Sequence, residues 1–196
     1  LHLQRLMRLH ILGICGTFMG GLAKIAREAG HTVTGCDAQV YPPMSEQLRD
    51  LGIGLHEGYD AEQLERYPAD LYVVGNAMTR GKPVIEEILN RGLPYVSGPQ
   101  WLAEQVLPGK WVLAVAGTHG KSTTSGWLVH ALVGAGGDPG AFVGALLPAA
   151  ITGIGIPATA RRGSGVEFVV EADEYAGNFD PYRPDVIVLT SAEWDH

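Results

Sequence analysis

One run of residues in this sequence has the composition of a phosphate-binding loop. An apolar stretch at residues 111–116 leads into Gly-Thr-His-Gly-Lys-Ser-Thr, and a helix-forming stretch follows. Phosphate binding requires glycines that let backbone N–H groups surround the anion, a lysine that neutralises charge, and a hydroxyl that ligates Mg²⁺. Gly120, Lys121 and Ser122 meet these requirements, although Val115 stands where the general loop has its first glycine. We therefore predict an ATP site formed by Gly117, Thr118, His119, Gly120, Lys121, Ser122 and Thr123.

The histidine inside this loop, His119, has two interpretations. Imidazole titrates near neutral pH, so a general base is one of them. A hydrogen bond that shapes the loop is the interpretation that we favour.

Acidic and histidine residues follow two later apolar runs. Residues 168–171 end in Glu171, and the run at 186–190 is followed by the terminal His196. Because the loops after parallel strands line a ligand crevice, two adjacent strands of this kind would bring both residues to the same edge as Lys121. An acid at this edge can ligate or orient the Mg²⁺ of a nucleotide. The alternative is a solvated strand end at Glu171 and a frayed terminus at His196.

A second glycine-rich turn lies near the N-terminus. Residues 9–14 are expected to form a strand and residues 20–29 a helix, so backbone N–H groups in the turn between them can face an anion. Asp37 closes the next strand, about where dinucleotide-binding folds place a ribose-contacting acid. Cys15 and Phe18, however, stand where G-x-G-x-x-G needs glycine. The turn alone leaves three interpretations: a nucleotide diphosphate, which we favour, NAD or FAD, or a tight packing turn.

Strand-like and helix-like stretches alternate along the chain, which is typical of an α/β protein with a mostly parallel sheet. Further strands are expected at 32–36, 71–74 and 94–97, and helices at 45–51, 83–90, 100–106 and 122–133. The Pro108-Gly109 pair predicts a linker. We therefore expect a Rossmann-like domain at 1–107 and a P-loop-type domain at 108–196. The last expected strand ends six residues before the sequence does, so we expect an incomplete second domain and a longer natural protein.

Composition and charge exclude several classes of protein. Of 196 residues, 46% are apolar, and the net charge is −7 without a basic cluster, which argues against nucleic acid and anionic membranes as partners. The uncharged run at 139–160 is long enough to consider as a membrane span, but Pro148 and Pro157 interrupt it. Two cysteines do not make a disulfide scaffold, and we interpret Cys15 and Cys36 as structural residues. We expect a cytoplasmic protein.

Three motifs in this order, Gly-Thr-His-Gly-Lys-Ser-Thr, Glu-Ala-Asp-Glu and a strand followed by Asp-His, resemble the Mur ligase family of peptidoglycan synthesis. The first half is similar to the members that attach a murein tripeptide, at residues 10–23, 41–45, 75–81 and 97–102. The second half is closer to the members that add L-alanine, at residues 171–182 and 191–196, with Ser191 where the family usually has Asn. The acceptor therefore stays open between tripeptide and L-alanine.

This resemblance implies an ATP-dependent amide ligase that acts on UDP-N-acetylmuramate through an acyl phosphate. It implies catalytic roles for Lys121, Glu171 and His196, with Lys121 on the β- and γ-phosphates. It also implies Mg²⁺ ligands at Ser122, Glu171 and His196. It places the UDP-sugar at Gly13, Cys15, Gly16, Thr17, Phe18 and Met19, with Asp37 toward the uridine.

The family's third domain is missing from this sequence, so we expect the chain alone to lack turnover. Two other readings stay open. One is a P-loop kinase with an unrelated nucleotide domain, and the other is a chain that only binds UDP-sugar.

Overall fold

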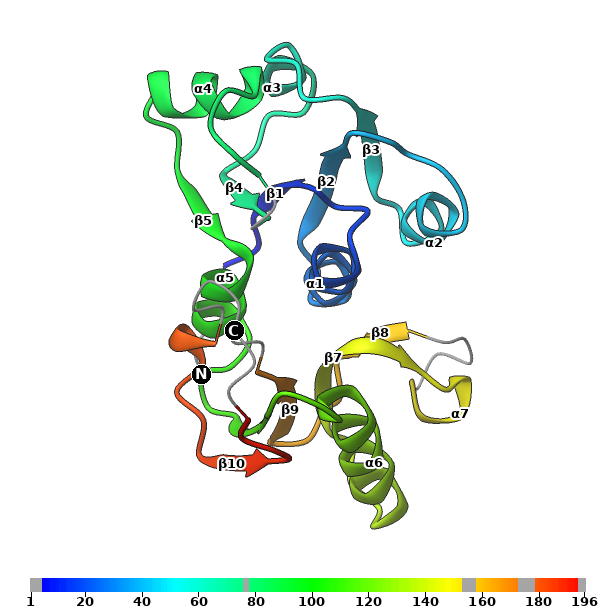
Figure 1. Ribbon diagram of the computed structural model, residues 1–196. Coiled ribbons are helices and arrows are strands. Elements are labelled where there is room, and N and C mark those ends of the chain that lie inside the picture. The colour runs from blue at the N-terminus through cyan, green and yellow to red at the C-terminus, as the bar shows by residue number, and fades with distance from the viewer. Residues whose placement is uncertain (1–4, 76–77, 153–157, 173–178, 194–196) are drawn as a thin grey trace. The chain divides into compact units, whose positions relative to one another are not determined.

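The computed structural model describes residues 5–75, 78–152, 158–172 and 179–193 (Figure 1). The chain divides into two compact units, Leu1–Trp101 and Leu102–His196, and each unit contains one five-stranded sheet. The expected α/β fold is therefore confirmed. The domain boundary expected at residue 108 lies between α5 (Gly98–Gln105) and β6 (Trp111–Ala116), and it stays a prediction.

The first unit is a parallel, Rossmann-like sheet. Its strands lie in the order β3-β2-β1-β4-β5, and every pairing is parallel. The strands are β1 (Arg8–Leu12), β2 (Thr32–Asp37), β3 (Gly54–Glu57), β4 (Leu71–Val74) and β5 (Tyr95–Ser97). The helices are α1 (Thr17–Glu28), α2 (Met44–Asp50), α3 (Gln63–Arg66), α4 (Pro83–Asn90) and α5. One core cluster joins strand residues such as Leu12 and Cys36 to Val84 and Ile88 of α4.

The second unit is a mixed sheet in the order β10-β6-β9-β7-β8. Only the β7–β8 pairing is antiparallel among the pairings that the structure describes. The further elements are α6 (Lys121–Gly134), β7 (Gly140–Leu147), α7 (Ala149–Thr152), β8 (Ala158–Arg161), β9 (Glu167–Glu171) and β10 (Val186–Leu189). A short 3₁₀ helix at Asp180–Tyr182 precedes β10. Val129 of α6 packs on Val115 and Val169 of the sheet, and all three side chains are fully buried.

The uncharged run at 139–160 contains β7 and α7 and the start of β8, with residues 153–157 outside the described part. The first residues of β7 are buried because they lie between β9 and β8. A strand that is buried on both faces has a continuous apolar sequence without polar alternation. No helix among the residues that the structure describes is long and apolar enough to cross a membrane.

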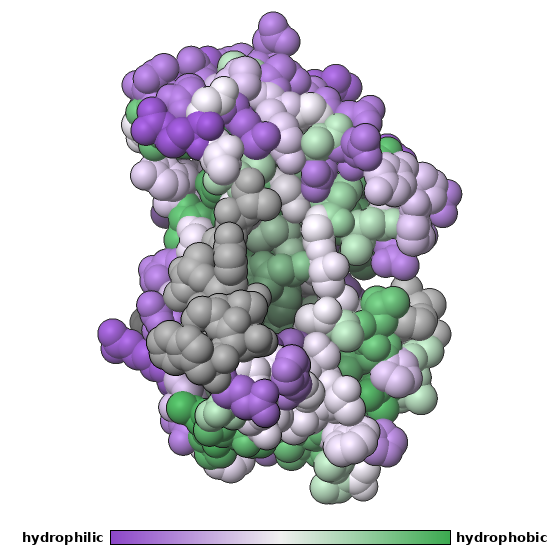
Figure 2. Space-filling view, viewed as in Figure 1, coloured by the Kyte–Doolittle hydropathy of each residue, from purple (hydrophilic) through white to green (hydrophobic). Residues whose placement is uncertain are grey.

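The face in Figure 2 differs in polarity along the chain: much of the first unit is hydrophilic there, and apolar patches lie on the second unit. Large exposed apolar side chains of the second unit include Trp127 on α6, Leu146 on β7, and Ile187 and Leu189 on β10. β10 is an edge strand, so its side chains have a neighbouring strand on one side only.

Candidate functional site

The phosphate loop predicted from the sequence connects β6 to α6. β6 is buried from Val112 to Val115, and the loop then passes through two glycines with positive φ, Gly117 at 140° and Gly120 at 79°. Gly120 is the N-cap residue of α6, and Lys121 is its first residue. The first N–H groups of a helix have no partner within the helix, so the start of α6 offers donors for an anion.

Two predicted metal ligands meet beside this loop. The Ser122 hydroxyl lies 3.0 and 2.9 Å from the two carboxylate oxygens of Glu171 and donates a hydrogen bond to this group. The Gly144 N–H of β7 also donates to Glu171, at 2.7 Å. Glu171 ends β9, where it pairs in register with Val115 of β6. A carboxylate at the end of β9 and a hydroxyl in the first turn of α6 are thus placed together.

The third expected metal ligand, His196, lies outside the described residues. Within the described part of the chain, no group of three or more His, Cys, Asp or Glu side chains is arranged to hold a metal ion. The strands that precede Glu171 and His196 are not adjacent, contrary to our expectation, because β6 lies between β9 and β10. The sheet therefore places the phosphate loop between these two strand ends. Oxygen donors of the Ser122 and Glu171 kind suit Mg²⁺.

The backbone of His119 is used to fasten the loop. Its N–H donates to Ser191 Oγ at 3.2 Å, and its carbonyl oxygen accepts from Thr190 Oγ1 at 2.5 Å. These contacts involve the backbone alone, so the choice between a general base and a loop-shaping hydrogen bond for the imidazole stays a prediction. Thr190 and Ser191 were not among our predicted site residues. The only sequence signal was Ser191 at a position where the family usually has Asn.

The glycine-rich turn of the first unit connects β1 to α1. The N–H groups of Gly13 and Ile14 donate to the Cys36 carbonyl oxygen at 2.8 and 3.1 Å. These bonds hold the turn against the end of β2. Gly16 then caps α1 in an extended conformation, so the helix N-terminus opens directly behind the turn. The helix begins at Thr17, three residues earlier than expected.

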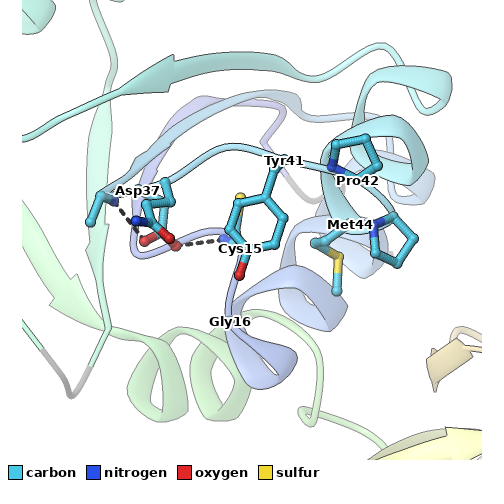
Figure 3. Close-up of a pocket in the computed structure, with 9 residues that line it drawn as sticks. Cys15, Gly16, Asp37, Tyr41, Pro42 and Met44 are labelled. Atoms are coloured by element: carbon cyan, nitrogen blue, oxygen red, sulfur yellow. Dashed lines mark hydrogen bonds between the residues drawn. The ribbon is translucent and has the colours of Figure 1, made fainter.

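The carboxylate of Asp37 binds the same turn. It accepts hydrogen bonds from the Cys15 N–H at 2.9 Å, from the Ala38 N–H at 2.7 Å and from the Tyr59 hydroxyl at 3.2 Å. Asp37 lies beside an open pocket of about 480 Å³ (Figure 3). Tyr41 and Met44, the first residue of α2, also line this pocket. The size is within the range of small-molecule sites.

The remaining predicted residues of this loop differ in exposure. Thr17 is exposed and Phe18 is half-buried. Met19 is buried, and its side chain fills the space beside Gly75 and Gly98. The Met19 side chain is therefore a packing group, and only its backbone can contribute to an anion site at the start of α1.

Both cysteines have the properties of structural thiols. Neither forms a disulfide. Burial raises the pKa of Cys36 to about 12, and burial together with the nearby Asp37 carboxylate raises the pKa of Cys15. A catalytic thiol needs a lowered pKa, because the thiolate is the nucleophile.

A second pocket, of about 420 Å³, adjoins the phosphate loop within the second unit. Ser122 and Thr123 are among its lining residues, and the rest of the lining is mainly apolar, with Trp127 and Leu146 as examples. A ligand held by the loop would therefore have an apolar surface beside it.

A Rossmann-like unit followed by a phosphate-loop unit defines a class of nucleotide-binding α/β proteins. Residues 8–108 match the family described as "Mur ligase family, catalytic domain". The chain belongs to the Mur ligase family.

Two curated relatives of different acceptor class match nearly the whole chain. UDP-N-acetylmuramate--L-alanyl-gamma-D-glutamyl-meso-2,6-diaminoheptandioate ligase of Escherichia coli K12 is 51% identical over 97% of this chain. UDP-N-acetylmuramate--L-alanine ligase of Arthrobacter sp. FB24 is 39% identical over 99% of it. The chain spans 42% and 39% of the lengths of these two relatives.

A solved structure of a tripeptide ligase is similar to this chain as well. The UDP-N-acetylmuramate:L-alanyl-gamma-D-glutamyl-meso-diaminopimelate ligase from Neisseria meningitides is 48% identical, with a TM-score of 0.88. The match covers 98% of this chain and 62% of that one. The similarity to tripeptide ligases therefore extends through both units.

Proposed function

We propose that this chain serves an ATP-dependent ligase that joins UDP-N-acetylmuramate to the tripeptide L-Ala-γ-D-Glu-meso-diaminopimelate in peptidoglycan recycling. The observation that carries the proposal is the Ser122–Glu171 contact beside the phosphate loop, in a chain 51% identical to a tripeptide ligase. ATP and nucleotide-activated sugars are cytoplasmic metabolites, so the proposal assigns the reaction to the cytoplasm.

The reaction that we propose begins at the phosphate loop. ATP phosphorylates the muramyl carboxylate, the acceptor amine attacks the resulting acyl phosphate, and inorganic phosphate leaves. Lys121, at the start of α6, neutralises charge on the β- and γ-phosphates. Mg²⁺, when bound, supplies further charge neutralisation next to Ser122 and Glu171. Positioning and charge neutralisation account for most of the rate in phosphoryl transfer, so these groups need no covalent role.

The first unit supplies the UDP-sugar site in this proposal. The N-terminus of α1 faces the turn formed by Gly13, Cys15 and Gly16, and such a helix N-terminus binds a diphosphate well. Asp37 offers a carboxylate acceptor for ribose or uracil donors at the edge of the pocket. Cys15 and Phe18 make the turn a poor dinucleotide fingerprint, which argues against NAD.

The runner-up acceptor is L-alanine. It is favoured by the 39% identity to an L-alanine ligase over 99% of the chain and disfavoured by the higher identity to the tripeptide ligases. A chain that binds UDP-sugar without serving a ligase is the remaining alternative.

Calorimetry on the 196-residue chain tests the two binding sites. We expect UDP-N-acetylmuramate to bind, and NAD to bind more weakly or not at all. We expect Mg²⁺-ATP to bind to the wild-type chain and not to the Lys121→Ala variant. Tighter binding of NAD than of the UDP-sugar would reverse the assignment of the first unit.

A pair of chimeras tests catalysis and the acceptor class. In each, this chain replaces the matching segment of a relative, either the Escherichia coli tripeptide ligase or the Arthrobacter L-alanine ligase. We expect the chimera with the Escherichia coli tripeptide ligase to release phosphate when its acceptor is added. The chimera with the Arthrobacter L-alanine ligase should release little. Turnover in the L-alanine background alone would favour the runner-up. Two inactive chimeras beside active parents would favour a UDP-sugar binder.

A further inference from the structure

Two hydroxyl residues that follow β10 hold the phosphate loop from the side. Thr190 and Ser191 lie more than 70 residues from the loop in sequence, yet they contact three successive loop residues, Gly117, Thr118 and His119. Both are half-buried. Neither residue has been given a role in the function proposed above.

The two hydroxyls bind both polar groups of the His119 backbone. Thr190 Oγ1 donates to the His119 carbonyl oxygen at 2.5 Å, and Ser191 Oγ accepts from the His119 N–H at 3.2 Å. This N–H is therefore committed to Ser191 and does not face a phosphate. The start of α6, a helix N-terminus, is the part of the loop that we assign to the anion.

Ser191 also orients a side chain of the loop. Its Oγ lies 2.8 Å from Thr118 Oγ1, in hydrogen-bond contact. Thr190 is itself anchored, because its N–H donates to the Ala116 carbonyl oxygen at 2.9 Å and extends the β6–β10 ladder by one bond. The backbone of Thr190 is thus hydrogen-bonded to the end of β6, which fixes the position from which its side chain reaches the loop.

Gly117 shows how closely the two segments approach. A Cβ atom built on Gly117 would lie 2.0 Å from Thr190 Oγ1 and 3.0 Å from the Ser191 backbone nitrogen. With φ at 140°, Gly117 also has a backbone conformation that favours glycine. Thr190 therefore occupies the space that a side chain at residue 117 would need, so this close approach requires glycine.

We propose that Thr190 and Ser191 are positioning residues that fix the phosphate loop in its nucleotide-binding conformation. They act through the backbone of His119 and the hydroxyl of Thr118, and we assign them no contact with the nucleotide. The proposal deepens the ATP-dependent function proposed above and rests on it for the ligand. Preorganisation of this kind lowers the ordering cost at the moment of binding.

The first experiment needs no ligand. Amide hydrogen exchange of His119 is measured by NMR in wild type, Thr190→Val, Ser191→Ala and the hydroxyl-retaining Thr190→Ser. We expect exchange at His119 to accelerate by at least about fivefold in Ser191→Ala, the equivalent of about one hydrogen bond, and to stay near wild type in Thr190→Ser. Unchanged exchange in Ser191→Ala would overturn the proposal.

The second experiment measures Mg²⁺-ATP affinity by calorimetry on the same variants. We expect Kd to rise about five- to tenfold in Thr190→Val and Ser191→Ala and to be restored in Thr190→Ser. Thr152→Val is the matched control, since Thr152 is a buried threonine of the same unit whose hydroxyl donates to the Ala149 carbonyl oxygen at 3.1 Å. It should lower the unfolding midpoint without changing Kd.

The two readouts separate failure of this proposal from failure of the proposed function. Wild-type affinity in both Thr190→Val and Ser191→Ala would overturn the positioning role, and so would an equal loss of affinity in Thr152→Val. If the wild-type chain binds no Mg²⁺-ATP, the ATP-dependent function fails at this site. The exchange of the His119 amide then still decides whether Thr190 and Ser191 hold the loop.

Discussion

The hydroxyl of Ser122 lies 2.9 Å from Glu171 Oε2, although 49 residues separate the two along the chain. Ser122 is held by the first turn of α6 and Glu171 by the end of β9, whose neighbour β6 leads into the phosphate loop. The contact therefore depends on the order of the strands.

Removal of the Glu171 carboxylate should lower turnover strongly and leave UDP-sugar binding by the first unit unchanged. In the tripeptide-ligase chimera we expect Glu171→Ala to lower turnover by about 10³-fold, since a charge-positioning group at a phosphoryl-transfer site contributes on this order. UDP-N-acetylmuramate affinity, measured by calorimetry, should stay near wild type. Unimpaired turnover would remove Glu171 from the site.

A methyl group at Gly144 should displace Glu171 without removing it. A Cβ atom there would lie 2.9 Å from Glu171 Oε2 and 3.2 Å from its carboxyl carbon. We expect Gly144→Ala to lower chimera turnover by about tenfold or more, as for a misplaced catalytic group. Gly134→Ala, at the end of α6 with open space around its Cβ, is the control and should retain activity. Equal activity of the two variants would contradict the prediction.

His10 should make the stability of the first unit depend on pH. Its ring is fully buried between Thr34 Oγ1 and Gln63 Oε1, each at 2.8 Å. Burial lowers its pKa from the ordinary value of 6.5. Between this lowered pKa and 6.5 the unfolded chain binds more protons than the folded one. The free energy of unfolding therefore falls as pH falls through this window, and the stabilisation is fully present above it.

Urea unfolding at pH 5, 6, 7 and 8 measures this dependence, with His10→Gln as the comparison. We expect a smaller pH slope in the variant. His31, whose pKa burial also lowers, should retain part of the slope. Equal slopes in wild type and variant would mean that His10 does not titrate differently on folding.

The two thiols should react slowly and in a fixed order. The pKa of Cys36 is raised to about 12 and that of Cys15 is raised as well, so both are protonated at pH 8. We expect iodoacetamide to label half-buried Cys15 slowly and buried Cys36 only after unfolding, as followed by mass spectrometry. Saturating UDP-N-acetylmuramate should protect Cys15, because this residue lines the proposed pocket. Rapid labelling of Cys36 in the folded chain would contradict the assignment.

The sequence by itself determined several local strands and helices and the phosphate loop. Strands β4 and β6 and helix α4 have the predicted bounds, because each is a short apolar or amphipathic segment between clear turn signals. The loop at 117–123 was recognisable for a related reason. Phosphate binding demands glycine, lysine and hydroxyl residues that are contiguous in the chain, so its signal is local.

The tertiary structure alone decided which distant residues meet. β7 was missed because its first residues are buried, so it lacks the polar alternation by which a strand is recognised. The position of β6 between β9 and β10 was missed because strand order depends on long-range pairing, which leaves no periodic pattern in either strand. That order brings Glu171 to one side of the phosphate loop and Thr190 and Ser191 to the other. Contacts between residues 49 to 74 positions apart are fixed by the packing of the whole sheet, and no short stretch of sequence encodes them.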